Sequence, residues 1–401
     1  MKLFPNTVNG VVKALDDIFN GHSYADKVIE RVLKSNPKWG ARDRAFIAES
    51  VYEIVRWWRL IQVLSPSEDF YHVFATYWVM NGRSLPDWIE FKGIDAGKIK
   101  SHYERLTDRA VLQSIPDWLD QMGEELLGEK WEKELESLNQ EAEVVLRTNT
   151  LKTTRKNLQE QLEELGISTY PPKGYADALV LRERKNVFRT PLFKAGLFEV
   201  QDASSQLVAA ALDAQPGMRV IDACAGAGGK SLHLAAMMEN KGRVLSLDTE
   251  AWKLQNTKLR ARRAGVSIIE TKAIEGNKTI KRLANSAERL LLDVPCSGLG
   301  VLRRNPDTKW KISPVTLLKV RELQKEILSH YPSMLKAGGI LVYATCSILP
   351  TENTQQVQDF LSSPSGSEFE LIEEKQVLSH ESGFDGFYIA KMKKKLGASK
   401  N

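Results

Sequence analysis

The sequence predicts an α/β protein in three parts: an all-helical N-terminal region, a small α/β module, and a C-terminal domain built on a doubly wound parallel sheet. Three observations carry this prediction. The 401 residues are enough for two or three domains, since one domain usually takes about 100 to 200 residues. Apolar residues recur at helical spacing over residues 6–139. From residue 203 onward, short apolar runs typical of buried parallel strands alternate with helical segments.

The composition limits the class of protein. Hydrophobic residues make up 42% of the chain and charged residues 27%, which excludes a disordered or collagen-like protein. No apolar run approaches the roughly 20 residues of a membrane helix, and the first residues lack the apolar core of a secretory signal. The three cysteines form no closed disulfide framework. We therefore expect a cytoplasmic protein without a membrane partner.

The helical region is predicted over residues 1–138. Val11, Leu15 and Ile18 fall on one helix face, and seven of the nine tryptophans of the chain lie in this region. Between Lys27 and Arg59, eight basic residues outnumber four acidic ones and are interleaved with tryptophans. Such a surface suits RNA, and a solvated helix face explains the pattern equally well.

The small α/β module is predicted over residues 139–202. It opens with a strand at 144–149 and continues with a helix that stops at Gly166, a residue typical of helix C-termini. Two further strands are predicted at 167–170 and 179–181.

The C-terminal domain is predicted over residues 203–395, and residues 396–401 are assigned to a basic tail. Its apolar runs predict parallel strands at 218–222, 243–248, 290–293 and 339–344. In such a sheet the ligands lie at the carboxyl ends of the strands.

A glycine-rich loop follows the first of these strands. It consists of Cys224, Ala225, Gly226, Ala227, Gly228, Gly229 and Lys230. A phosphate-binding P-loop needs glycine six positions before the lysine, where Cys224 stands. A dinucleotide fingerprint needs glycine or alanine where Ser231 stands. Neither pattern matches fully, and a loop that lays bare backbone against a cofactor without phosphates is the third possibility.

Asp248 ends the second strand, 22 residues after Gly226. At this distance an acidic side chain binds ribose hydroxyls in folds of this kind. The alternative role is that of a cap for the next helix.

Two cysteines follow the third and fourth strands. Cys296 comes after Asp293 and a proline, and Cys346 directly follows an apolar strand. Because parallel strands present their carboxyl ends at one edge, we expect both thiols and the Asp293 carboxylate to converge beside the glycine loop. The cysteines form no CxxC pair and have no histidine pair nearby, so we expect no metal site.

These motifs together resemble those of the RsmB/NOP family of RNA cytosine-5 methyltransferases, which carry a Pro-Cys and a Thr-Cys motif on adjacent strands. The glycine loop is similar to the first motif of class I methyltransferases, and the similarity extends to residues 301–310 and 385–387. The resemblance implies a class I (Rossmann-like) methyltransferase domain, an RRM-like insert and a NusB-like helical domain that binds RNA. It also implies S-adenosylmethionine as the cofactor.

The resemblance implies a role for each candidate residue. Cys346 is the nucleophile that adds to carbon 6 of cytosine, because carbon 5 alone is too poor a nucleophile to take a methyl group, and Cys296 assists release of the product. Asp293 holds the cytosine edge, and Lys230 supplies positive charge to the thiolate or the base. The implied cofactor-binding residues are Cys224, Ala225, Gly226, Ala227, Gly228, Gly229, Lys230, Asp248, Glu275 and Asp293. The implied RNA-binding residues are Arg303, Arg304, Lys309 and Trp310.

Two positions depart from the pattern of the family. Gly226 and Ala227 stand where relatives usually carry Ala-Pro, which implies a less rigid loop. Glu275 stands before Gly276 where relatives usually carry aspartate, so it is either an adenine contact or an exposed loop acid.

The expected function is methylation of carbon 5 of cytosine in RNA, with S-adenosylmethionine as the donor. The resemblance implies small-subunit ribosomal RNA as the target, and we expect a monomer. The target base must be unstacked before a thiol reaches carbon 6. Three alternatives stay open: a catalytically silent RNA-binding ribosome assembly factor, a P-loop-like ATPase, and a DNA cytosine methyltransferase whose nucleophile is the Pro-Cys thiol.

Overall fold

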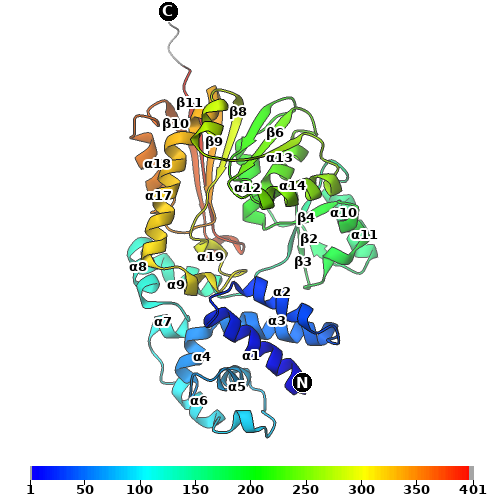
Figure 1. Cartoon of the computed structure of the whole chain (residues 1–401), viewed down its shortest axis with the longest axis vertical. Coiled ribbons are helices and arrows are strands. Elements are labelled where there is room, and N and C mark those ends of the chain that lie inside the picture. The colour runs from blue at the N-terminus through cyan, green and yellow to red at the C-terminus, as the bar shows by residue number, and fades with distance from the viewer. Residues whose placement is uncertain (1, 397–401) are drawn as a thin grey trace, which may run out of the picture. The chain divides into compact units, whose positions relative to one another are not determined.

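The computed structural model describes residues 2–396, which divide into two compact units (Figure 1). The helical unit contains the chain up to Gln140 and a distant segment, Leu302–Pro314, which we call the strap. The sheet unit contains Glu141–Val301 and the chain from Val315 onward. The predicted small module and the predicted C-terminal domain, apart from the strap, therefore belong to one compact unit.

The helical unit packs around a large apolar core and a smaller one formed by Leu60, Leu64, Ile99 and Val111, in keeping with its helical periodicity. Buried side chains of its first helices line the large core, with Trp39, Phe74 and Trp78 as large aromatic members. Its helices are α1 (Pro5–Phe19), α2 (Ala25–Ser35), α3 (Ala41–Arg56), α4 (Trp58–Leu64), α5 (Phe70–Met80), η1 (Ile89–Phe91), α6 (Ala96–Tyr103), α7 (Arg109–Leu112), α8 (Asp117–Leu127), η2 (Gly128–Lys130), α9 (Trp131–Leu138) and, in the strap, α16 (Thr308–Lys311).

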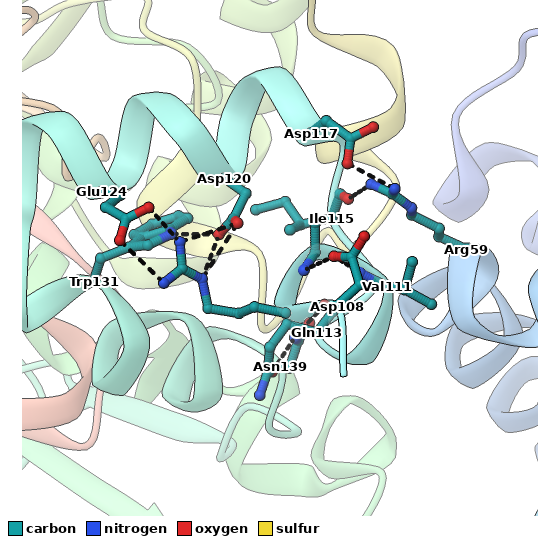
Figure 2. A network of polar contacts seen from close by, with 12 residues as sticks. Arg59, Asp108, Val111, Gln113, Ile115, Asp117, Asp120, Glu124, Trp131 and Asn139 are labelled. Carbon is teal, nitrogen blue, oxygen red and sulfur yellow. Dashed lines mark hydrogen bonds and ion pairs between the residues drawn. The ribbon is translucent and has the colours of Figure 1, made fainter. Parts of the chain in front are cut away.

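A polar network joins the last helices of this unit (Figure 2). Arg109 donates to Asp120 at 3.0 Å and to Glu124 at 2.8 Å, and the indole N–H of Trp131 donates to Asp120 at 2.7 Å. Gly123 approaches the Trp131 ring so closely that a Cβ atom there would lie 2.3 Å from a ring carbon. The bonds of Arg109 hold α7 against α8, and the contacts of Trp131 with Asp120 and Gly123 hold α8 against α9.

The small module contains an antiparallel four-stranded sheet in the order β2-β3-β1-β4. Leu158 and Leu162 of its main helix belong to the buried core of the module. The helix ends just before Gly166, whose φ of 70° suits glycine. The elements are β1 (Val145–Thr148), α10 (Arg155–Glu164), β2 (Thr169–Tyr170), β3 (Ala178–Leu181), η3 (Val187–Arg189), α11 (Pro191–Lys194) and β4 (Phe198–Val200).

The rest of the sheet unit is built on seven strands in the order β10-β11-β9-β8-β5-β6-β7. The five strands from β9 to β7 in this order are parallel, and β11 runs antiparallel to both of its neighbours. Its strands are β5 (Arg219–Asp222), β6 (Arg243–Asp248), β7 (Ile269–Ala273), β8 (Ala287–Asp293), β9 (Leu335–Thr345), β10 (Phe369–Val377) and β11 (Phe387–Lys394). Its helices are α12 (Ala203–Leu212), α13 (Gly229–Met237), α14 (Ala251–Ala264), α15 (Asn277–Arg282), η4 (Leu299–Val301), α17 (Pro314–His330), η5 (Tyr331–Met334), α18 (Thr354–Leu361) and α19 (Ser379–Ser382).

Helices cover both faces of the large sheet, as the predicted doubly wound fold requires (Figure 1). One face packs against α12 and α13, and the other packs against α15, α17 and α18. The four predicted parallel strands correspond to β5, β6, β8 and β9, so this part of the fold prediction is confirmed. The β10–β11 hairpin was not predicted, because most of β10 is exposed and lacks a buried apolar run.

Two negative findings apply to residues 2–396. No helix in this range is both long and apolar enough to cross a membrane. No group of three or more His, Cys, Asp or Glu side chains in this range is arranged to hold a metal ion. The predicted basic tail at 396–401 lies outside the described residues, apart from Leu396.

Candidate active site

Two cysteines meet where strands β8 and β9 end. In this parallel pair Asp293 lies opposite Ala344, so the chain leaves both strands at the same edge of the sheet. The sulfur atoms of Cys296 and Cys346 are 3.2 Å apart, and both are free, half-buried thiols. The structure therefore brings together the two thiols that the sequence places 50 residues apart.

The two cysteine loops are also packed backbone against backbone. The N–H of Gly300 donates to the carbonyl of Cys346 at 2.9 Å, and the carbonyl of Gly300 accepts from Gly386 at 2.7 Å. A Cβ atom on Gly300 would lie 2.2 Å from the Gly386 oxygen, so only glycine permits this approach. This packing gives a structural reason for the conspicuous Asp385-Gly386-Phe387 motif.

The thiol of Cys296 holds its proton at neutral pH. Its hydrogen bond with Cys346, then its burial, and then the charge of Cys346 raise the pKa of Cys296 well above the ordinary value. Either sulfur can donate in this contact, and a protonated Cys296 is able to donate its S–H toward the sulfur of Cys346. Since the thiolate is the reactive form of cysteine, this arrangement favours Cys346 as the nucleophile of the pair.

Lys230 and Asp293 form an ion pair of 2.7 Å close to the cysteines. Burial would lower the pKa of Lys230, but the charge of Asp293 and its hydrogen bond outweigh burial, and the charge of Cys346 adds to them. The net shift of the Lys230 pKa is upward. Lys230 is therefore a fixed cation that lies near both a carboxylate and the candidate nucleophile.

The glycine loop turns sharply between β5 and α13. Gly226 and Gly228 have φ angles of 54° and 80°, a region that favours glycine. Asp248 accepts from the N–H of Gly226 at 2.8 Å and from the N–H of Glu250 at 2.8 Å. The hydroxyl of Thr257 donates to the carbonyl of Gly226 at 3.3 Å. Asp248 thus lies against the loop and closes a turn with Glu250, the residue before α14, but it does not cap that helix.

The donor set of this loop fits S-adenosylmethionine better than a nucleotide phosphate. A Cβ atom on Gly226 would meet nothing within 4 Å, so the loop offers a face of bare backbone. The cation that a P-loop would direct at phosphate, Lys230, is already paired with Asp293. Each oxygen of Asp248 that accepts one N–H keeps a lone pair for a ribose hydroxyl. Of the other predicted cofactor contacts, Ala225 is buried, Cys224 and Gly229 are half-buried, and Ala227 and Glu275 are exposed.

Asp222, at the end of β5, forms a buried polar chain beneath the loop. Ser231 donates to Asp222 at 2.6 Å and accepts from Ser246 at 2.7 Å. Burial raises the pKa of Asp222 to about 7, and Asp293 contributes to the rise. This chain joins β5, β6 and α13 under the loop.

The predicted RNA-binding residues lie in the strap, where they contact the helical unit. Lys309 is 1% exposed, its ammonium donates to Asn139 at 3.0 Å, and burial lowers its pKa well below the ordinary value. The indole N–H of Trp310 donates to the carbonyl of Val55 at 2.7 Å. Arg303 is also buried, at 7% exposure, and Arg304 is half-buried.

That Arg303, Arg304, Lys309 and Trp310 contact RNA stays a prediction, and the burial of Lys309 argues against its share in such a contact. Lys309 has almost no surface with which to reach a phosphate, and the indole N–H of Trp310 is bonded within the protein. The guanidinium of Arg56 donates to the carbonyl of Arg303 at 3.0 Å, so the backbone of the strap is held as well. The basic and aromatic pattern of residues 303–310 reflects anchoring of the strap.

Sequence reasoning missed a group of residues that hold the cysteine loops. Glu352 lies between them and accepts hydrogen bonds from Ser297 and Ser347. The sequence contains one indication of this group: a serine directly follows both Cys296 and Cys346.

A second missed group ties the small module to the glycine loop. Arg260 donates to the carbonyl of Ala227 at 2.8 Å and pairs with Glu199 of β4 at 3.0 Å. Arg147 of β1 donates to the carbonyl of Gly229 at 2.6 Å. The loop, whose alanine lies between two glycines, is thus held from outside by two arginines.

Protein-family models match two parts of the chain. A protein-family model described as 16S rRNA methyltransferase RsmB/F matches residues 209–393, and one described as the RsmF/B-like ferredoxin-like domain matches residues 115–188. The probable ribosomal RNA small subunit methyltransferase B of Synechocystis sp. is 32% identical over 440 residues, which cover 95% of this chain and 97% of that protein.

Two solved structures share the fold. The crystal structure of PH0851 superposes with a TM-score of 0.83 at 22% identity, covering 98% of this chain and all of that one. A methyltransferase homolog from Pyrococcus horikoshii has a TM-score of 0.64 at 27% identity, covering 72% of this chain and 98% of that one.

Proposed function

Because the chain belongs to the RsmB/F family of 16S rRNA methyltransferases, we propose that it methylates carbon 5 of a cytosine in small-subunit ribosomal RNA. It is a methyltransferase that uses S-adenosylmethionine and acts on ribosomal RNA. The position of the methyl group on cytosine and the roles of the individual residues are the proposal.

The proposed reaction begins at Cys346. Its thiolate adds to carbon 6 of the unstacked cytosine, and the electron pair of the 5,6 double bond moves to make carbon 5 nucleophilic. When bound against the glycine loop and Asp248, S-adenosylmethionine supplies the methyl group. Loss of the proton from carbon 5 then lets the bond between carbon 6 and sulfur break, and the electron pair returns to Cys346.

We assign Cys296 to the release of the product. While Cys346 is a thiolate, the shared hydrogen bond and the charge of Cys346 help keep Cys296 protonated. Once the sulfur of Cys346 is bonded to carbon 6, both influences disappear and the pKa of Cys296 falls. Cys296 then becomes able to assist proton loss at carbon 5 only after the adduct has formed.

In this scheme Asp293 binds the base, and Lys230 stabilises the negative charge that develops during the reaction. The Asp293 carboxylate is 25% exposed, so it is accessible at the end of β8 to accept from the exocyclic amino group of cytosine. The Lys230 cation stabilises negative charge on the thiolate or on the base. The observation that carries the whole proposal is the 3.2 Å separation of the two sulfurs next to this ion pair.

The test is transfer of a labelled methyl group from S-adenosylmethionine to small-subunit ribosomal RNA, followed by nucleoside analysis. We expect 5-methylcytidine from the unaltered protein, no product from Cys346→Ala, and a covalent RNA adduct on denaturing gels with Cys296→Ala. Methyl label on another nucleoside would refute the assigned position. Full activity of Cys346→Ala together with no adduct from Cys296→Ala would reverse the roles of the thiols.

We further propose that the protein acts as a monomer in the cytoplasm. Both candidate cysteines, the ion pair and the cofactor loop come from one copy of the chain. Sedimentation of the protein with and without RNA tests the oligomeric state.

A further inference from the structure

A buried carboxylate joins the two cysteine loops. Glu352, in the loop that follows β9, is 0% exposed. Four neutral groups donate to its two oxygens: the N–H of Ser297 at 2.8 Å, the hydroxyl of Ser297 at 2.5 Å, the hydroxyl of Ser347, and the amide of Gln324 at 3.0 Å. A buried carboxylate is costly unless such bonds compensate it. Its two oxygens let it accept from both loops at once.

The two loops depend on Glu352 to different extents. The Cys346 loop has further ties, because the N–H of Ser347 donates to Thr345 at 3.2 Å and its carbonyl accepts from Asn353 at 2.9 Å. The Cys296 loop also has ties of its own, because Gln324 donates to the carbonyl of Pro295 at 2.9 Å and the N–H of Leu299 donates to Ser297 at 3.3 Å. Ser297, however, directs both its N–H and its hydroxyl to Glu352, whereas Ser347 directs only its hydroxyl there. Loss of the carboxylate should therefore displace Cys296 more than Cys346.

We propose that Glu352 is a positioning residue that sets the sulfur of Cys296 against that of Cys346 for the release half of the reaction. The inference rests on the proposed function, because it uses the two roles assigned to the thiols. It adds a residue that contacts neither RNA nor cofactor in that scheme and acts through Ser297. A shift of about 1 Å in a catalytic group is enough to slow a step by about a hundredfold.

The first test follows turnover and adduct in the full-length Glu352→Ala protein. We expect turnover to fall about tenfold or more, because several hydrogen bonds to a buried carboxylate are lost. We expect the covalent RNA adduct to accumulate toward the level of Cys296→Ala, since addition continues while release slows. The thermal shift caused by S-adenosylhomocysteine should stay unchanged, and Glu352→Gln, which keeps the shape and one acceptor oxygen, should restore part of the turnover.

A matched control and a milder variant accompany this test. Glu374, on β10, also accepts from two hydroxyls, those of Thr354 and Tyr388 at 2.5 Å, and neither of these donors follows a cysteine as Ser297 and Ser347 do. Glu374→Gln should release product at the normal rate. If Glu352→Ala does not fold, Ser297→Ala removes a single hydroxyl from the same network and should accumulate a smaller amount of adduct.

A second test needs no RNA. Phenylarsine oxide binds two neighbouring thiols together, forming two As–S bonds and releasing one water. The unaltered protein should bind it through Cys296 and Cys346, while Cys296→Ala and Cys346→Ala should not. Glu352→Ala should bind it about tenfold or more weakly if the sulfurs have moved apart.

The outcomes separate the two proposals. Normal release and normal arsenical binding by Glu352→Ala would overturn the positioning role, as would an equal loss of adduct formation and release. If Cys296→Ala itself traps no adduct, the proposed roles of the thiols fail, and weakened arsenical binding by Glu352→Ala would still support positioning of the sulfur pair.

Discussion

Lys230 shows at the scale of one residue how the site keeps a charge in a partly buried place. Its side chain is 12% exposed, and its charge is matched by Asp293 at 2.7 Å. The pair leaves the ammonium charged, because the upward influences on the pKa of Lys230 exceed the effect of burial. A neutral side chain of similar length would leave the Asp293 carboxylate unpaired beside the cysteines.

We therefore expect Lys230→Met to lower the rate of methyl transfer by about 100-fold or more, the usual loss when a group that stabilises developing charge is removed. Single-turnover transfer of labelled methyl groups measures this rate. The control is Lys241→Met, because Lys241 is also paired with a carboxylate but its side chain is 67% exposed. Equal rates for the two variants would contradict an electrostatic role for Lys230.

At the scale of an element, the glycine loop also depends on charged partners that lie outside it. Gly226 and Gly228 give the loop its shape but also give the unfolded chain additional freedom. Arg260 and Arg147 counter this freedom by holding the carbonyls of Ala227 and Gly229. Since the loop carries Gly226-Ala227 and no proline that would stiffen it, these external ties are what restrict its backbone.

The expected result of Glu199→Gln is weaker binding of S-adenosylhomocysteine, by about threefold to tenfold, because Arg260 loses the partner that orients it. Isothermal titration calorimetry measures the change. Glu270→Gln is the control, since Glu270 pairs with Arg243 on the exposed edge of the sheet. If both variants bind S-adenosylhomocysteine equally well, the pairing of Glu199 with Arg260 does not support cofactor binding by the glycine loop.

The contact between α13 and the small module predicts a dependence of stability on pH. His233 of α13 donates to Asp177 at 3.0 Å and is buried. Burial, and then the positive charge of Arg147, lower the pKa of His233 from 6.5 to about 4. Between these two values the unfolded chain binds a proton that the folded chain does not, so the free energy of unfolding falls as the pH falls. This contribution is complete above pH about 6.5.

Urea unfolding at a series of pH values from 7.5 down to 4 tests this dependence. We expect the unaltered protein to lose about 2 to 3 kcal/mol more over this range than His233→Gln, which cannot bind the proton. Parallel stability curves for the two proteins would show that His233 does not titrate as inferred.

The elements also show which parts of the site were predictable. Cys296, Cys346, Asp293 and Asp248 follow apolar strands, and the ends of parallel strands meet at one edge whatever the loops do. The position of Glu352 depends on how the chain folds back after β9, which no periodic pattern records. The packing of the strap could not be predicted for a similar reason: its helix, Thr308–Lys311, is too short to show an amphipathic pattern.

At the scale of the whole molecule, the main feature is the strap. It completes the helical unit, although about 160 residues of the chain separate it from the rest of that unit. Asp307 accepts from the N–H of Ala25 at 2.9 Å, at the start of α2. Arg56, which is 3% exposed, donates to strap carbonyls, and Trp310 packs against the core of the helical unit. Basic and aromatic residues that suggested RNA contact are thus used for folding.

We expect Trp310→Ala to lower the free energy of unfolding by about 2 to 3 kcal/mol, through lost packing and an unpaired Val55 carbonyl. Thermal and urea unfolding of the full chain measure the loss. Trp252→Ala is the control, because Trp252 is 61% exposed and its removal should change stability by about 0.5 kcal/mol or less. An unchanged stability together with weakened RNA binding would instead support Trp310 as an RNA contact.

The strap also sets an order of events during synthesis. Ribosomes release the N-terminal helices first, but the strap leaves the exit tunnel only after about 160 further residues have been added. Until then Arg56 has no strap carbonyls to bind and the start of α2 lacks its Asp307 partner. The first part of the nascent chain therefore waits, incompletely folded, until most of the sheet unit has been translated, and a truncated product that ends before residue 302 would be a target for chaperones and proteases.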